Sequence, residues 1–193
     1  MPDSYHHGDL RRTLLNEAGS VLEDQGIAAL SLRDLARRAG VSATAPYHHF
    51  KGKADLVCAL SEDALLALDA ELAAPDHADP RERMRAQGVA YVLFAVEHPE
   101  RFRLAFRPDL GDPFEEQSRS KVLDDTTIAF RQLIRVVREI EPDPDRQLGL
   151  AMTAWSAVHG LAALLVDGPL RPVAADRDRV RALAEDVTRR IRL

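Results

Sequence analysis

Apolar residues recur at steps of three and four along nearly the whole chain. In the first segment Leu10, Leu14, Ala18 and Val21 follow these steps, and Gly26 marks its end. Such steps place side chains on one face of an α-helix, whereas a half-buried strand alternates at every second residue. No segment shows convincing alternation, so the sequence predicts an all-α fold.

The same pattern divides the rest of the chain into helices separated by turn residues. Ser31, with Asp34 three residues later, is typical of a capped helix start, and Gly40 suits the left-handed backbone of a tight turn. Ser42 is predicted to cap a short helix that ends near Phe50. Further helices are predicted at 53–74, 81–97, 99–106, 114–140, 146–166 and 177–191. The breaks between several of them, such as "PDHADP", "EPDPD" and "DGPLRPVAAD", are rich in proline and aspartate.

The segment 31–50 has the layout of a helix-turn-helix, because two short helices flank the turn "AGV". Leu35, Val41 and Phe50 are expected to form the small core that fixes the two helix axes near a right angle. The second helix would then be free to enter a DNA major groove, which is wide enough to admit one.

The predicted second helix carries groups suited to nucleic acid. On an α-helix, Thr44, Tyr47 and His48 would share a face that presents a hydroxyl, a phenol and an imidazole. Pro46 is expected in the first turn, where a missing N–H costs least, with its ring turned toward the small core. Helix-turn-helix geometry also occurs in proteins that never touch DNA, so this pattern alone leaves both interpretations open.

Charge distribution favours the DNA-binding interpretation. The chain has a net charge of −5, but between residues 31 and 53 five cations face one anion, a local net charge of +4. The cations are Arg33, Arg37, Arg38, Lys51 and Lys53, and the anion is Asp34. A locally basic segment supplies the attraction to phosphates that specific DNA binders need.

Composition narrows the class of protein further. The 193 residues, 46% of them hydrophobic, are enough for one compact domain, or for a small domain attached to a larger one. No apolar run approaches the roughly 18 to 20 residues that span a bilayer, and residues 1–12 lack the features of a signal peptide. Cys58 is the single cysteine, which fits a reducing compartment, so a cytoplasmic protein without membrane association is expected.

Catalytic and metal-binding patterns are missing. The pairs His6/His7 and His48/His49 are adjacent, and neighbours on a helix point about 100° apart, so a pair does not chelate one ion well. Ser156 precedes His159 by three residues, but no carboxylate is placed to orient the histidine. No metal, no cofactor and no enzymatic activity are therefore expected.

The N-terminal sixty residues closely resemble the DNA-binding domain of TetR-family transcriptional regulators. The resemblance rests on "RRTLLNEAGSVLEDQGIAAL" followed by "LSLRDLARRAGVSATAPYHHFKGKADL", and the start "YHHGDLRR" also recurs in relatives. It implies an N-terminal helix-turn-helix domain at 1–52 and a larger helical effector-binding and dimerisation domain at 53–193. Proline at position 46 departs from the leucine of most of the family, which puts the tilt of the second helix in question.

The resemblance also implies which residues contact double-stranded operator DNA. Arg33 matches a DNA-contacting position on the helix before the turn. The positions that match base-facing residues are Ala43, Thr44, Ala45 and His48, and those that match phosphate-facing residues are Tyr47, His49 and Lys53.

The C-terminal half resembles the WHG domain of one TetR subgroup, on Trp155, His159 and Gly160 in "AWSAVHGLAALL" and on "YVLFAVEHPERFRLAF". It implies a homodimer formed by the last two long helices, Arg146–Val166 and Arg177–Ile191. Small residues at 149, 151, 154, 157 and 160 would permit close helix approach, although alanine is also simply a good helix former.

An effector pocket is expected among the helices that follow the DNA-binding domain. The candidate lining residues are Tyr91, Phe94, His98, Phe102, Phe106, Met152, Trp155 and His159. Met152, Trp155 and His159 form one helical stripe, and such a stripe is more often plain core than a ligand site.

Three hypotheses follow. The leading one is a repressor whose operator binding is released by a small, mostly apolar effector. The second is a DNA-bound structural or protein-recruiting factor without an effector, and the third is an all-α enzyme in which the helix-turn-helix is incidental.

Overall fold

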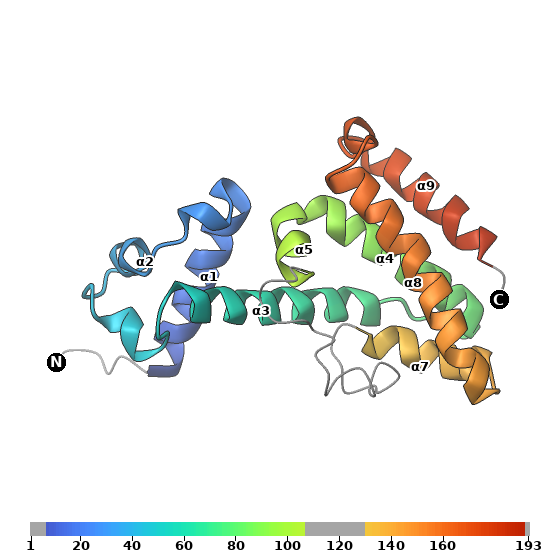
Figure 1. Ribbon diagram of the computed structural model, residues 1–193, viewed down its shortest axis with the longest axis horizontal. Helices are drawn as coiled ribbons and strands as arrows, with labels where there is room; N and C mark the ends of the chain where they lie inside the picture. Colours follow the sequence, from blue (N-terminus) through green and yellow to red (C-terminus); the bar gives the residue numbers. More distant parts are fainter. Residues whose placement is uncertain (1–6, 107–129, 192–193) are drawn as a thin grey trace. The chain divides into compact units, whose positions relative to one another are not determined.

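The computed structural model of the chain describes residues 7–106 and 130–191 (Figure 1). These residues form eight α-helices and three short 3-10 helices, and within the same ranges there is no strand. The predicted all-α fold is confirmed. The described residues divide into two compact units: 7–64 with 100–106, and 65–99 with 130–191. The predicted domains 1–52 and 53–193 stay a prediction.

The first unit begins with α1 (His7–Gln25), η1 (Ile27–Ala29) and α2 (Leu32–Arg38). It continues through η2 (Ala45–His48) into the start of α3 (Lys53–Ala73), and it includes α5 (Pro99–Ala105) apart from the first residue of that helix. Its core is formed by fully buried apolar side chains that include Leu14, Leu35, Phe50, Leu56 and Leu104, with Val41 packed at the margin. The expected core of Leu35, Val41 and Phe50 is therefore present.

Local sequence signals explain how α2 starts and how the turn after it forms. The Ser31 hydroxyl caps α2 by accepting a hydrogen bond from the backbone N–H of Asp34 at 3.4 Å. Gly40 has a φ of 70°, the left-handed region that suits glycine, and the next residue, Val41, donates its N–H to the carbonyl of Ala36. Both expectations for this turn are confirmed.

The expected α-helix from Ser42 to Phe50 was wrong. The structure has a single 3-10 turn, η2, from Ala45 to His48, and Ser42 makes no capping hydrogen bond to it. The physical reason is Pro46, because in an α-helix begun at Ser42 the N–H of residue 46 would donate to the Ser42 carbonyl and proline has none. The segment closes instead by three-residue bonds, including Tyr47 N–H to Thr44 at 3.1 Å.

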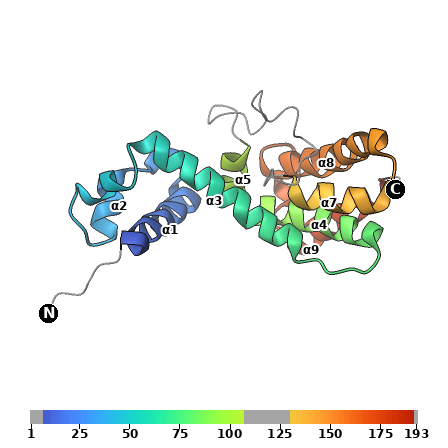
Figure 2. The same ribbon diagram turned by 90° about the horizontal axis from the view of Figure 1, so that it is seen from below.

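The second unit is a bundle in which α4 (Pro80–Glu97) packs against α7 (Arg131–Ile140), α8 (Pro144–Val166) and α9 (Arg177–Arg190). Figure 2 shows these helices side by side, with η4 (Arg171–Val173) between α8 and α9 in the chain. Aspartates cap α4, α8 and α9: the side chains of Asp79, Asp143 and Asp176 each accept a backbone N–H of the first turn. The predicted helix 114–140 is present from Arg131 onward, and its earlier part lies outside the described residues.

The expectation that no segment is apolar enough to span a membrane needs correction for α8. By length and composition α8 could cross a bilayer, because an 18-residue window within it has a mean hydropathy of 1.6. Glycine, serine and threonine interrupt the apolar run but carry no charge, so they lower the average only slightly. In the structure α8 instead buries residues such as Ala151, Val158 and Leu165 against α4, α7 and α9, and 39% of that window is buried.

Candidate DNA-binding surface and effector cavity

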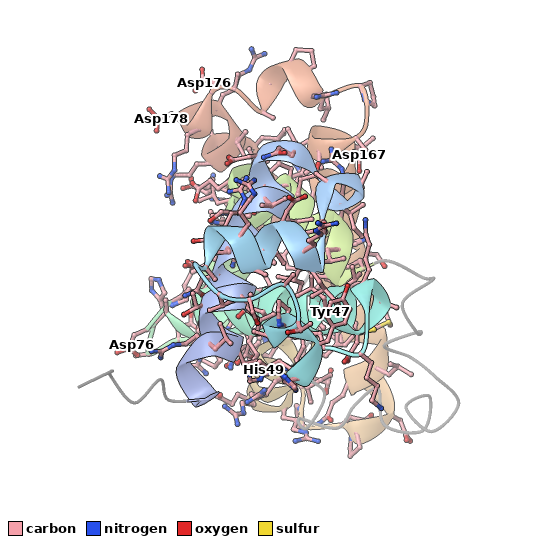
Figure 3. All side chains as sticks on the ribbon, turned by 90° about the vertical axis from the view of Figure 1, so that its left-hand side faces the viewer. Tyr47, His49, Asp76, Asp167, Asp176 and Asp178 are labelled. Atoms are coloured by element: carbon pink, nitrogen blue, oxygen red, sulfur yellow. The ribbon has the colours of Figure 1, made fainter. Side chains whose placement is uncertain are left out.

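The turn η2 has exposed polar side chains and is anchored by buried apolar residues. Pro46 and Phe50 are buried, whereas Thr44, Tyr47 and His48 are exposed, Tyr47 by 56% of its surface. Tyr47 and His49 lie on the face of the first unit turned to the viewer in Figure 3. The apolar residues thus hold η2 in place while its polar residues remain available to a partner.

The 3-10 geometry bears on which of these side chains share a face. Successive residues of a 3-10 helix are about 120° apart, and η2 begins at Ala45, one residue after Thr44. The expectation that Thr44, Tyr47 and His48 share a face assumed an α-helix, and it stays a prediction. The Thr44 hydroxyl lies 3.1 Å from that of Ser42, so these two side chains orient each other.

The remaining predicted contacts differ in exposure. Ala43 is exposed, while Ala45 and His49 are half-buried. Arg33 is exposed on α2 and forms no ion pair or hydrogen bond with a residue that the structure describes. Lys53, the first residue of α3, is exposed, and its ammonium donates a hydrogen bond to the Ala28 carbonyl at 3.0 Å.

Neighbouring arginines are partly engaged in ion pairs. Arg37 lies 3.8 Å from Asp34, and Arg38 lies 4.0 Å from Glu17. Exposed pairs at such distances contribute little stability, so these arginines can exchange their partners for phosphates at low cost. The Arg11 guanidinium lies 5.4 Å from the centre of the Phe50 ring and adds a further cation to the same unit.

A small cavity lies inside the second unit, with a volume of about 50 Å³. It is lined by residues of α3, α4, α7, α8 and α9 together with one residue that follows α9. The lining residues are Leu72, Met84, Arg85, Gln87, Gly88, Tyr91, Leu133, Ala154, Trp155, Val158, Thr188 and Ile191. Two of the predicted effector residues, Tyr91 and Trp155, are among them.

Tyr91 links the cavity to His159 through hydrogen bonds. Its hydroxyl lies 2.7 Å from Nδ1 of His159, and the Trp155 side chain hydrogen-bonds to the same hydroxyl. Burial raises the pKa of Tyr91 well above its usual range, and burial lowers the pKa of His159. Both groups are therefore neutral, and the hydrogen bond between them is one between a phenol and a neutral imidazole.

The other predicted effector residues lie apart from this cavity. Phe94 and His98 pack together with their ring centres 5.3 Å apart and line an open groove beside α4 and α9. Phe102 and Phe106 pair at 5.2 Å within the first unit. Met152 is half-buried at the margin of the core around Phe130 and Ile134.

Sequence reasoning missed two of the polar residues that line the cavity, Arg85 and Gln87. They fall in the polar-looking stretch "RERMRAQG", where charged neighbours suggest an exposed face. Gln87 is nevertheless 8% exposed. The one sequence signal for its burial is that Gln87 stands two residues before the apolar run that starts at Val89. Among the described residues, no three His, Cys, Asp or Glu side chains gather as a metal site.

Two family models match the chain. One, described as "Bacterial regulatory proteins, tetR family", matches residues 14–60. The other, described as "Tetracyclin repressor-like, C-terminal domain", matches residues 84–189 and is not specifically a WHG domain.

Full-length comparisons agree with these matches. The chain is 29% identical to the HTH-type transcriptional regulator BetI 1 of Chromohalobacter salexigens, over 91% of this chain and 87% of that protein. It is 29% identical to the HTH-type transcriptional activator FasR of Mycolicibacterium smegmatis, over 83% of this chain and 74% of that protein.

Solved structures show the same fold. A protein of unknown function from Rhodococcus sp. RHA1 has a TM-score of 0.71 and 32% identity, covering 98% of this chain and 99% of that one. A TetR variant from Acinetobacter baumannii AYE in complex with minocycline has a TM-score of 0.61 at 17% identity, over 92% of this chain and 93% of that one. Since the C-terminal model alone matches more than half of the residues, the chain belongs to the TetR family of transcriptional regulators, which are DNA-binding proteins and not enzymes.

Proposed function

We propose that the chain is a homodimeric operator-binding repressor that a small, mostly apolar effector releases from DNA. The observation that carries this proposal is the η2 turn, whose polar residues are exposed while Pro46 and Phe50 hold it in the core. A DNA-binding regulator acts where the chromosome lies, so we place it in the cytoplasm.

In this proposal the bases are read from η2 and the turn before it. Thr44 and His48 supply hydrogen-bonding groups, while Ala43 and Ala45 allow close approach and can meet a thymine methyl. Tyr47 and His49 contact the phosphates on either side. Arg33, which has no partner among the described residues, and Lys53 add charge-assisted phosphate contacts.

A dimer is proposed through α8 and α9. Gly149 and Gly160 lie on the exposed side of α8, and a Cβ added at either would meet nothing within 4 Å. Leu148 and Leu164 on the same helix are 43% and 44% exposed, and Leu183 and Val187 are half-buried on α9. An apolar face with open glycines is suited to a second copy of the same helices, and a two-fold pair would present η2 twice to one operator.

The effector response is proposed from the cavity around Trp155. A ligand that bound both conformers equally would shift nothing, so the effector must favour the conformer whose η2 turns are wrongly spaced for DNA. The alternative is a DNA-bound structural or protein-recruiting factor without an effector, for which a filled core would be expected. The cavity, with an aromatic wall and buried polar atoms, favours the effector.

The finer WHG subgroup is also part of this proposal. It is supported by Trp155 and His159, whose rings lie 5.0 Å apart within α8.

The test of DNA binding is an electrophoretic mobility shift with the duplex upstream of the protein's own gene. Wild type is expected to bind with strong salt dependence, and Tyr47→Ala to lose at least about tenfold in affinity, since a hydrogen bond to a charged group contributes about 1.5–3 kcal/mol. Leu66→Ala, a change at another exposed large side chain, is the matched control and should bind as wild type does. Equal binding by Tyr47→Ala, or no salt-sensitive binding to any operator-like duplex, would refute the proposal.

A further inference from the structure

Two residues that line the cavity each have a polar side-chain atom buried without a partner. The atoms are Oε1 of Gln87 and Nε of Arg85, both on α4, and no hydrogen bond reaches either one. Gln87 as a whole is 8% exposed, so water does not replace the missing partner at its surface. Native proteins pair nearly all buried polar atoms, and an unpaired acceptor and an unpaired donor on residues that line one cavity therefore indicate a missing binding partner.

The rest of the cavity offers a ligand almost only apolar surface. Leu72, Met84, Leu133, Ala154 and Val158 supply aliphatic side chains. The polar groups nearby are already bonded: the Tyr91 hydroxyl to His159, and the Thr188 hydroxyl to the Glu185 carbonyl. Polar recognition is thus left to Arg85 and Gln87.

The charges of the lining favour a neutral ligand. Arg85 is the one charged residue among the lining residues, and its guanidinium already pairs with Glu82, three residues earlier on α4. A carboxylate ligand would leave one negative charge uncompensated against an apolar wall, which is costly. A ligand without any polar group would leave both buried atoms unpaired.

We propose that the cavity binds a small, neutral, mainly apolar molecule that carries one hydroxyl group. The hydroxyl accepts a hydrogen bond from Nε–H of Arg85 and donates one to Oε1 of Gln87. If the amide of Gln87 is rotated so that its NH₂ faces the cavity, the hydroxyl oxygen accepts from it instead. This inference rests on the proposed effector response and names the chemical class of the effector.

The surroundings of Arg85 indicate how such a molecule lies. Arg85 and Thr188 also line an open groove of about 580 Å³ formed by the end of α3, α4 and α9. The ligand enters from this groove, its hydroxyl stays at Arg85, and its apolar body lies against Trp155. The cavity volume of about 50 Å³ exceeds the roughly 10–15 Å³ that one water requires. A single-ring probe needs more room than this, which the groove that shares Arg85 and Thr188 supplies.

The chain reports occupancy of this cavity through its own fluorescence, because Trp155 is the single tryptophan and lines the wall. The experiment titrates the full-length protein with phenol, with toluene, which replaces the hydroxyl by a methyl group, and with benzoate. Phenol is expected to bind about tenfold more tightly than either of the other two, since a site built for a hydroxyl rejects analogues that lack it.

Two variants test whether the preference for phenol over toluene depends on Gln87. Gln87→Leu should bind phenol and toluene about equally, whereas Gln147→Leu, which removes a half-buried glutamine of α8 outside the cavity, should keep the wild-type preference. Equal binding of phenol and toluene by wild type, tighter binding of benzoate, or no response to any probe would each overturn the inference. All three of these outcomes are measured on wild type, so they do not depend on whether a variant folds. The mobility shift on DNA is a separate measurement, so a negative result with the probes would overturn the ligand class and leave the proposed DNA binding standing.

Discussion

Nδ1 of His159 lies 2.7 Å from the Tyr91 hydroxyl, and the two groups share a hydrogen bond. Burial lowers the pKa of His159 below its ordinary value of about 6.5, so the folded protein holds it neutral in a range where the unfolded chain binds a proton. In that range the unfolded state carries more protons, and stability rises with pH. The contribution of this residue is complete above about pH 6.5 and is lost as the pH falls below that value.

Thermal unfolding at several pH values measures this effect. The melting temperature of wild type is expected to fall between about pH 7.5 and pH 5.5, and His159→Gln, whose amide can still hydrogen-bond to Tyr91 but does not titrate, should show a shallower fall. His77→Gln, at an exposed histidine, is the matched control and should keep the wild-type slope. Equal slopes for wild type and His159→Gln would contradict the assignment.

Residue-level signals predicted the local features of the first unit well. Ser31 as a cap and Gly40 as a left-handed turn residue are decided within a few residues of chain, so sequence alone was enough. Arg85 and Gln87 were missed because their burial is set by α8 and α9, more than fifty residues away, and not by their polar neighbours on α4.

At the scale of elements, η2 shows how one proline changes a recognition surface. Replacing Pro46 by alanine restores an N–H that can donate to the Ser42 carbonyl, so an α-helical turn becomes available and the relative positions of Tyr47 and His48 change. We expect Pro46→Ala to bind the wild-type operator roughly tenfold more weakly, as measured by fluorescence anisotropy, because one lost base contact costs about 1–3 kcal/mol.

Pro172→Ala is the control for this substitution, since Pro172 also stands at the start of a 3-10 helix, η4, in the second unit. Its operator affinity should match that of wild type. Unchanged affinity in Pro46→Ala would mean that the 3-10 geometry of η2 plays no part in recognition.

Helix boundaries were otherwise predicted to within a few residues for the described elements, because their apolar steps and aspartate caps lie in the sequence. The sequence did not predict which elements each helix packs against. The stretch 91–106 was treated as one source of effector contacts, yet Tyr91 lines the cavity of the second unit, whereas Phe102 and Phe106 pair within the first. Periodicity identifies the buried face of a helix but not the element that covers it.

At the scale of the whole molecule, the proposed dimer can be tested by the mass of the particle in solution. Gly160→Arg should leave the single chain folded, since its Cβ meets nothing and arginine favours a helix more than glycine does. It should block close approach of a second α8, so the particle mass falls from twice 21.4 kDa to 21.4 kDa in light scattering.

Gly52→Arg is the matched control, because Gly52 is equally open but lies in the first unit. It should remain a dimer. A monomeric wild type, or a dimeric Gly160→Arg, would rule out α8 as the interface.

Hydroxyl-radical footprinting of wild type on its own upstream DNA tests most directly whether η2 is presented twice to one duplex. Two protected segments are predicted, with their centres about 34–36 Å apart along the duplex or a multiple of that spacing. Both should fade together in Tyr47→Ala. A single protected segment, or protection that persists unchanged in Tyr47→Ala, would contradict the account.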